Sequence, residues 1–204
     1  MFGIDSKFYE VVSKIADLVV LNLLFVLFSL PIITMGASTT ALYGVTKKMA
    51  ENREGYIFRN FFQLFKENFR QSTVMWIILL VAAVIPTIDL YIINSLKKTV
   101  ITTALKGLML AAALTVLLVF LYAMALQSTF ENTIKNTLKN AFLMGIGYFP
   151  WTLLILLITL LPIILIVLLG KTAGSVVYVM LFVGFAVLAY LNSYIFNHIF
   201  KKYM

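Results

Sequence analysis

A run of 29 consecutive residues without a charged side chain, residues 18–46, most constrains how this chain can fold. A helix that crosses the hydrocarbon of a membrane needs about 20 apolar residues, so the run is too long for one span and too short for two full spans. Proline removes a backbone donor and glycine permits a turn, and Pro31 and Gly36 stand in the middle of the run. The sequence therefore predicts a long helix that ends before Thr34 and a shorter membrane helix from Gly36, with a single span as the alternative.

The composition places most of the surface of the chain in lipid. Of the 204 residues, 62% are hydrophobic and 12% are charged, and the mean hydropathy is +1.02. A soluble protein of this size needs far more polar residues to cover its core. The net charge of +8 does not indicate nucleic-acid binding, because the 16 basic residues lie in the gaps between apolar runs. The absence of cysteine excludes disulfides, thiolate catalysis and thiolate metal sites.

The chain repeats one unit, an amphipathic segment followed by two membrane helices joined by a turn. Residues 2–18 and 58–71 carry apolar residues on one face and charged residues on the other, a pattern typical of helices at a membrane surface. We expect an all-α membrane protein of one domain, residues 1–204, that forms a polytopic bundle of five long transmembrane helices and one short membrane helix. These helices form three hairpins with cytoplasmic amphipathic connectors, at about residues 18–50, 72–126 and 141–198. Helix interruptions are expected at Pro86, Pro150 and Pro162.

The basic residues predict the orientation of the hairpins. With a hairpin at residues 18–50, twelve basic residues lie on one side of the membrane and four on the other, whereas a single span there gives ten against six. The excess of basic residues on the cytoplasmic side of membrane proteins favours the hairpin, with both termini in the cytoplasm. The twelve are Lys7, Lys14, Lys47, Lys48, Arg53, Arg59, Lys66, Arg70, Lys135, Lys139, Lys201 and Lys202, and the four are Lys97, Lys98, Lys106 and Lys171.

Two neighbouring segments resemble a known family. They are PIITMGASTTALYGVTKK, residues 31–48, and GYIFRNFFQLFKENFRQSTVMWII, residues 55–78, and together they resemble the YesL family of small bacterial integral membrane proteins. The resemblance implies a multi-pass protein of the bacterial cytoplasmic membrane, in a family often encoded near genes for carbohydrate uptake and polysaccharide degradation. It supplies no catalytic, cofactor-binding or metal-binding residues, because the family is catalogued as a domain of unknown function.

Three groups of residues are candidates for function. Phenylalanines set against cations suit a membrane surface or a groove on a partner protein. Small residues four apart let two helix backbones approach closely, within one chain or between protomers. Polar residues inside apolar runs are candidates for a substrate or ion pathway. The interaction surface comprises Phe58, Phe61, Phe62, Phe65, Lys66, Phe69 and Arg70, the helix-packing face Gly36, Thr40 and Gly44, and the polar intramembrane group Asn22, Asp89 and Asn192, with Thr115 and Gln127 as further polar members.

Asp89 has two interpretations. A carboxylate inside a membrane helix is a candidate for proton or cation coupling. Asp89 lies near the outer end of its span, however, where water or the nearby Lys97 and Lys98 can satisfy it. The structural interpretation is therefore favoured.

Two functions remain, and neither is enzymatic. The sequence contains no nucleophile beside a base, no carboxylate pair at catalytic spacing and no cofactor fingerprint, and one histidine alone makes no metal site. The first function is an accessory or interaction component beside a carbohydrate uptake system, with self-association as the other type of partner. The second is a small transporter, acting alone or as a homo-oligomer. Only a transporter needs its polar residues to converge on a hydrated cavity, so their placement distinguishes the two.

Overall fold

The structure, a computed structural model, describes residues 3–53 and 55–203, and every regular element in these residues is a helix. Within the described ranges, five helical segments are long and apolar enough to cross a membrane, which confirms the all-α, multi-pass fold class. In chain order the elements are α1 (Gly3–Ser29), η1 (Ile32–Thr34), α2 (Met35–Ala50), α3 (Ile57–Ser95), α4 (Val100–Gln127), α5 (Ile134–Gly147), α6 (Phe149–Leu169), η2 (Gly170–Thr172), α7 (Gly174–Val179), η3 (Met180–Gly184) and α8 (Phe185–Phe200).

α1 and α2 form a helical hairpin whose turn begins at Pro31. The Thr34 hydroxyl donates a hydrogen bond to the carbonyl oxygen of Phe28 at 2.6 Å and lies 2.8 Å from that of Pro31, which closes the turn. At the opposite end of the hairpin, the Lys14 amine donates to the side-chain oxygen of Asn52 at 2.7 Å. The middle of α1 therefore lies beside the end of α2, and the two helices are antiparallel.

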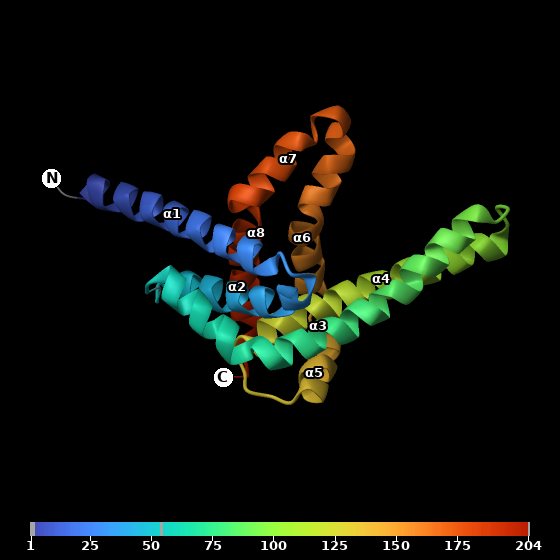
Figure 1. Cartoon of the computed structure of the whole chain (residues 1–204), viewed down its shortest axis with the longest axis horizontal. Coiled ribbons are helices and arrows are strands. Elements are labelled where there is room, and N and C mark those ends of the chain that lie inside the picture. Colours follow the sequence, from blue (N-terminus) through green and yellow to red (C-terminus); the bar gives the residue numbers. More distant parts are fainter. Residues whose placement is uncertain (1–2, 54, 204) are drawn as a thin grey trace.

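α2 lies at the centre of the molecule (Figure 1). Residues 36–46 are all buried, because α1, α3, α4 and α8 pack around them. Most residues in the first half of α2 are small, which lets several helix backbones approach it closely. We call this buried part of α2, together with the helix segments packed on it, the hub.

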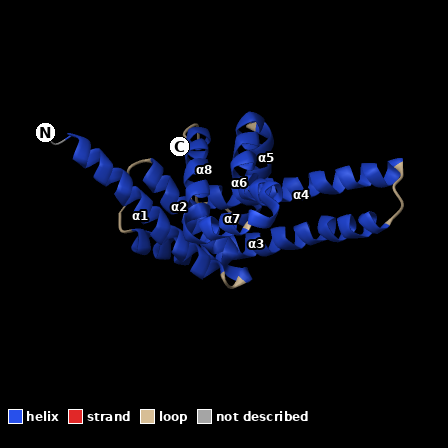
Figure 2. Cartoon of the chain, turned by 90° about the horizontal axis from the view of Figure 1, so that it is seen from above, coloured by secondary structure: helices blue, strands red, loops and turns tan. Residues whose placement is uncertain are grey.

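α3 and α4 form a long hairpin, and its outer part, residues 80–115, projects beyond the other helices in both views (Figures 1 and 2). We call this part the α3–α4 arm. The amphipathic segment that begins α3 continues into the span without a break, and 39 residues at 1.5 Å each extend about 58 Å. α3 is therefore much longer than the roughly 30 Å thickness of membrane hydrocarbon, so its amphipathic first part extends beyond an untilted span.

The prolines interrupt fewer helices than expected. Pro86 lies inside α3 and Pro162 inside α6, so the expected interruptions at these two residues are wrong. Membrane helices tolerate proline because neighbouring helices and hydroxyl side chains satisfy the freed backbone groups. Pro150 instead stands in the first turn of α6, where a backbone donor has no helical partner in any case.

The last long segment, Gly174–Phe200, contains a π-helix. α7 and α8 are joined through η3, whose five residues follow the wider π-helical turn. A π-helix displaces the backbone hydrogen bonds from their usual α-helical partners, and it occurs frequently at functional sites. η3 packs against α1.

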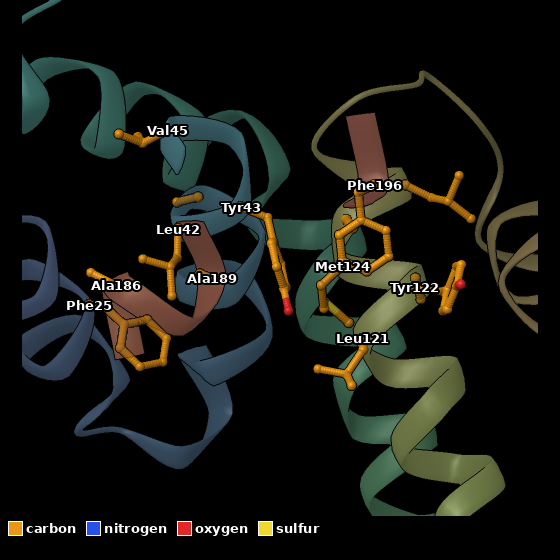
Figure 3. Packing of buried hydrophobic residues seen from close by; sticks show 14 of the residues in the cluster. Phe25, Leu42, Tyr43, Val45, Leu121, Tyr122, Met124, Ala186, Ala189 and Phe196 are labelled. Atoms are coloured by element: carbon orange, nitrogen blue, oxygen red, sulfur yellow. The ribbon is translucent and has the colours of Figure 1, made fainter. Parts of the chain in front are cut away.

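The hydrophobic core lies where the helices meet at the hub (Figure 3). The ring of Phe196 on α8 stands edge-on to the ring of Tyr43 on α2, with centroids 5.4 Å apart, and to that of Tyr122 on α4, at 5.1 Å. Edge-to-face pairs of this kind stabilise a core beyond the area that they bury. The helices are thus joined tightly at the hub and diverge from it, with α1, the α3–α4 arm and the α6–α7 end pointing in different directions (Figure 1).

Candidate functional site

The small-residue face of α2 packs against α3 of the same chain. A Cβ atom on Gly36 would lie 2.5 Å from the carbonyl oxygen of Ser72, so the two backbones are in direct contact there. One turn further along, the hydroxyl oxygens of Thr40 and Ser72 are 2.8 Å apart. At Gly44 an added Cβ would meet the side chain of Leu64. The face therefore has an internal packing role in this structure.

The phenylalanines at the start of α3 divide into a buried and an exposed set. Phe61 is fully buried, so its expected place on an interaction surface is wrong. Its ring lies 5.7 Å from that of Phe28 on α1, and the half-buried ring of Phe65 lies 5.0 Å from Phe28. These contacts hold α1 against α3. The candidate surface residues that remain exposed are Phe58, Phe62, Lys66, Phe69 and Arg70.

Asn22 on α1 binds the π-helix. Its amide nitrogen donates to the carbonyl oxygens of Met180 at 3.1 Å and Leu181 at 2.7 Å. Its amide oxygen accepts from the backbone N–H of Ala186 at 3.0 Å. Asn22 is fully buried, and both polar atoms of its side chain bond to backbone groups. The π-helical turn displaces such groups from their usual α-helical partners. This explains Asn22 as a structural residue.

The other polar residues of the apolar helices do not converge. Asp89 lies half-buried on the α3–α4 arm, which projects away from the hub (Figure 1). The hydroxyl of Thr115 donates to the Ala111 carbonyl of its own helix at 2.8 Å. Gln127 lies at the end of α4, where its amide nitrogen donates to the Gln71 side chain at 2.6 Å. These contacts form no continuous polar pathway through the described helices.

Asn192 borders a cavity of about 270 Å³ between α1, α2, α4, α6 and α8. Its amide nitrogen donates to the Thr159 hydroxyl at 3.1 Å, its side chain also has a hydrogen bond with that of Tyr43, and it is only 1% exposed. Tyr43 lines the same cavity, and its hydroxyl end lies between Ala189 on α8 and Leu121 on α4 (Figure 3). Most other lining side chains are apolar.

A second, polar pocket of about 350 Å³ lies where α2 ends. The Lys47 amine at its edge is half-buried and donates to the Thr129 hydroxyl at 3.3 Å. Arg53 is paired with Glu51. Burial and, to a smaller extent, the positive charge of Arg53 lower the pKa of Lys47 to about 8.

The depressed pKa of Lys47 predicts a pH dependence of stability. The unfolded chain holds the Lys47 proton up to its ordinary pKa of 10.5, so stability rises as the pH increases from about 8 towards 10.5. We expect Lys47→Met to raise the thermal midpoint at pH 7.5 by about 2 °C, since the group is only half-buried, and to leave little difference at pH 10. Lys48→Met is the matched control. Thermal unfolding in detergent at several pH values tests this, and a Lys47→Met difference that grows with pH would contradict it.

The sequence patterns did not indicate the central cavity. Tyr43, Thr159 and Asn192 come from three helices that are far apart in the sequence, and each residue alone is ordinary for its segment. The sequence offered only two local indications of this region: Asn192 is a polar residue in an apolar run, and α2 is rich in small residues. Neither indication says which helices meet.

Comparisons with known proteins identify a family only for part of the chain. Residues 18–90 match the model of a family described as "Protein of unknown function, DUF624". The matched stretch contains residues 31–48 and 55–78, the two segments that resemble the YesL family. No curated protein and no solved structure matches the chain. The matched stretch covers α2, most of α3 and the second half of the apolar span in α1.

Proposed function

We propose that the protein is a non-catalytic accessory protein of the bacterial cytoplasmic membrane that binds a carbohydrate uptake system. The observation that carries the proposal is the placement of the polar side chains. Asn22, Thr115 and Gln127 bond within the chain, and Asp89 lies on the α3–α4 arm away from Asn192. A transporter needs such groups to converge on its pathway, whereas a binding protein does not.

We propose that the partner binds to the exposed phenylalanines at the start of α3. Phe58 is 63% exposed, Phe62 46% and Phe69 40%, and Lys66 and Arg70 lie beside them. Aromatic residues with neighbouring cations suit an apolar patch whose rim carries acidic side chains. The partner is therefore an integral membrane protein with acidic residues close to its membrane surface. Its class, carbohydrate uptake, follows from the resemblance to the YesL family.

Co-purification tests this proposal. The full chain would be purified through an affinity tag from its native host in mild detergent, and the mass and composition of the particle would be determined. We expect a stoichiometric subunit of a carbohydrate uptake system. Phe58→Ser combined with Phe69→Ser should lower its recovery about tenfold, a loss that corresponds to roughly 1.4 kcal/mol of binding free energy.

The matched control is Phe142→Ser on α5, because Phe142 is 43% exposed and Phe69 is 40% exposed. Recovery of the partner should be unchanged by this substitution. Recovery of the wild-type protein alone, as a monomer or homo-oligomer, would contradict the accessory function. Sugar uptake into reconstituted vesicles would then test the transporter alternative.

Contacts at one end of the hub support the orientation with both termini in the cytoplasm. Besides Lys14 with Asn52, the hydroxyls of Tyr148 and Tyr203 lie 3.1 Å apart, and the ring of Phe130 lies 5.6 Å from that of Phe200. These pairs join segments that the charge distribution assigns to the cytoplasmic side. The α3–α4 and α6–α7 turns, which carry the lysines assigned to the other side, lie at the ends of separate projections (Figure 1).

Single cysteines test the orientation, because the chain has none of its own. Ser6→Cys and Asn52→Cys should both be protected from an impermeant thiol reagent in intact cells and labelled after lysis. Ser95→Cys, at the end of α3, should be labelled in intact cells. Opposite labelling of residues 6 and 52 would exclude the α1–α2 hairpin in the membrane.

A further inference from the structure

We infer that the polar pocket at the end of α2 binds a phosphate monoester, with the amines of Lys47 and Lys48 and the side-chain amide of Asn60 as its hydrogen-bond donors. The pocket lies between α2, the turn after it, the start of α3 and the residues that follow α4. It is separate from the partner-binding phenylalanines of α3, none of which lines it. An anion site here therefore goes beyond the accessory function.

The charges of the pocket favour an anion. Of its four charged lining residues, Arg53 pairs with Glu51, so these two charges offset each other. The other two, Lys47 and Lys48, are half-buried, and no acid among the described residues forms an ion pair with either amine. A phosphate monoester carries close to two negative charges at neutral pH and matches this excess, whereas a diester carries only one.

The free donors of the pocket have the chemistry that phosphate oxygens need. The Lys47 amine has one described acceptor, the Thr129 hydroxyl, and the Lys48 amine has none among the described residues. The amide nitrogen of Asn60 donates to no described residue either, and it lies beside Gly55, which has no side chain to cover it. Several N–H groups can thus point at one anion, and those of the amines form the stronger, charge-assisted hydrogen bonds.

The turn after α2 fixes the shape of the pocket. Asn52 has a φ of 51°, a left-handed conformation that asparagine tolerates and that commonly ends helices. The backbone N–H of Arg53 donates back to the carbonyl oxygen of Lys48 at 2.9 Å. That of Glu51 donates to the carbonyl oxygen of Lys47 at 3.2 Å. These last carbonyl oxygens of α2 are satisfied by the backbone, so they do not compete with an anion for the lysine amines.

The volume of the pocket suits a phosphate group with a small polar substituent. A phosphate group has five non-hydrogen atoms and replaces about five water molecules, or about 150 Å³ of liquid. The pocket of about 350 Å³ therefore leaves room for a group such as glycerol. Burial and the charge of Arg53 lower the pKa of Lys47 to about 8, so an anion beside the amine would offset a cost that the folded chain otherwise bears.

A phosphate monoester can reach this pocket from two sources. The charge distribution assigns Lys47 and Lys48 to the cytoplasmic side of the membrane, where soluble phosphate esters and lipid headgroups are both present. Glycerol phosphate is a soluble ester, and phosphatidic acid presents the same group at the membrane surface. The chemistry that the pocket recognises is the same in both, and an experiment with two arms distinguishes them.

Thermal unfolding of the full chain in lipid nanodiscs tests the inference. In the first arm, glycerol phosphate is titrated into protein in phosphatidylcholine nanodiscs, because a ligand of the folded state raises the thermal midpoint with its concentration. In the second arm the nanodiscs contain phosphatidic acid and no glycerol phosphate is added. A rise in the first arm identifies a soluble ester, and a rise confined to the second identifies the lipid. No rise in either arm would overturn the site.

Two variants assign the binding to the pocket. Lys47→Gln should weaken binding about tenfold, the effect of losing one hydrogen bond to a charged group. Asn60→Asp places a carboxylate beside the lysines and should abolish the rise in the midpoint. The midpoint of each variant without ligand establishes that it is folded. The matched control is Lys139→Gln on α5, because Lys139 is exposed and lies outside the pocket. Equal weakening by Lys47→Gln and Lys139→Gln would mean general charge attraction and would overturn the pocket.

A diester tests the match of charge. Glycerophosphoglycerol carries one negative charge and should bind about fivefold more weakly than glycerol phosphate, the ratio expected for about 1 kcal/mol from a partly exposed ion pair. Equal affinities for the two would overturn the assignment to a monoester.

Discussion

Alanine at Gly36 is expected to destabilise the protein by about 1–3 kcal/mol, the usual range for overpacking a tight contact. The added Cβ would lie 2.5 Å from the carbonyl oxygen of Ser72 and 2.5 Å from the Cβ of Trp76. Both atoms are fixed close to the backbone of α3, so no side-chain rotation relieves the overlap. α2 and α3 must move apart, and the 2.8 Å contact between the Thr40 and Ser72 hydroxyls lengthens with them.

The matched control is Gly107→Ala on the α3–α4 arm. No atom lies within 4 Å of a Cβ added there, so alanine should stabilise the helix by up to about 1 kcal/mol through its higher helix propensity. The measurement is the free energy of unfolding in mixed detergent micelles, followed by circular dichroism. Equal effects at the two glycines would show that the close contact between α2 and α3 does not exist.

The features that could be predicted from the sequence depend on short stretches of chain. Pro31 and the charge-free run around it determine the α1–α2 turn locally, whichever helices surround it. The spacing of Gly36, Thr40 and Gly44 likewise places three small residues on one face of any helix. The sequence left open whether that face meets α3 or a second protomer, because spacing describes only one of the two surfaces in a contact.

The features that could not be predicted depend on residues distant in the sequence. The apolar face of residues 58–71 could pack equally well against a lipid surface, a partner protein or another helix of the chain. In the structure Phe61 and Phe65 pack against another helix of the chain, because their rings contact Phe28 on α1. These contacts become visible only once α1 is placed beside α3. The cavity beside Asn192 depends in the same way on five helices that meet at the hub.

Asn22 shows how a polar residue in an apolar run is explained by its distant partners. In the sequence it is a candidate for a pathway, because an uncompensated amide in lipid is costly. In the structure its cost is offset by the π-helix, whose carbonyl oxygens at Met180 and Leu181 and N–H group at Ala186 it satisfies. The two features need each other, since removal of either leaves buried polar groups without partners.

Asn22→Leu is therefore expected to lower the free energy of unfolding by about 2–5 kcal/mol, since hydrogen bonds inside membrane proteins contribute about 0.6–1.7 kcal/mol each and three are lost. Thr115→Val is the control, because the Thr115 hydroxyl bonds only to its own helix, and its effect should stay below about 0.5 kcal/mol. Unfolding in mixed micelles gives the stability, and hydrogen exchange at the Ala186 amide gives a local readout.

The exchange measurement distinguishes the proposed bond from a general loss of packing. If the Asn22 oxygen protects the Ala186 N–H, that amide should exchange faster in Asn22→Leu than amides of α8 outside the contact, such as that of Ala189. A uniform increase along α8 would mean that the leucine only loosens the helix. Unchanged exchange at Ala186 would contradict the bond itself, and the π-helix would then need another explanation for its stability in a buried position.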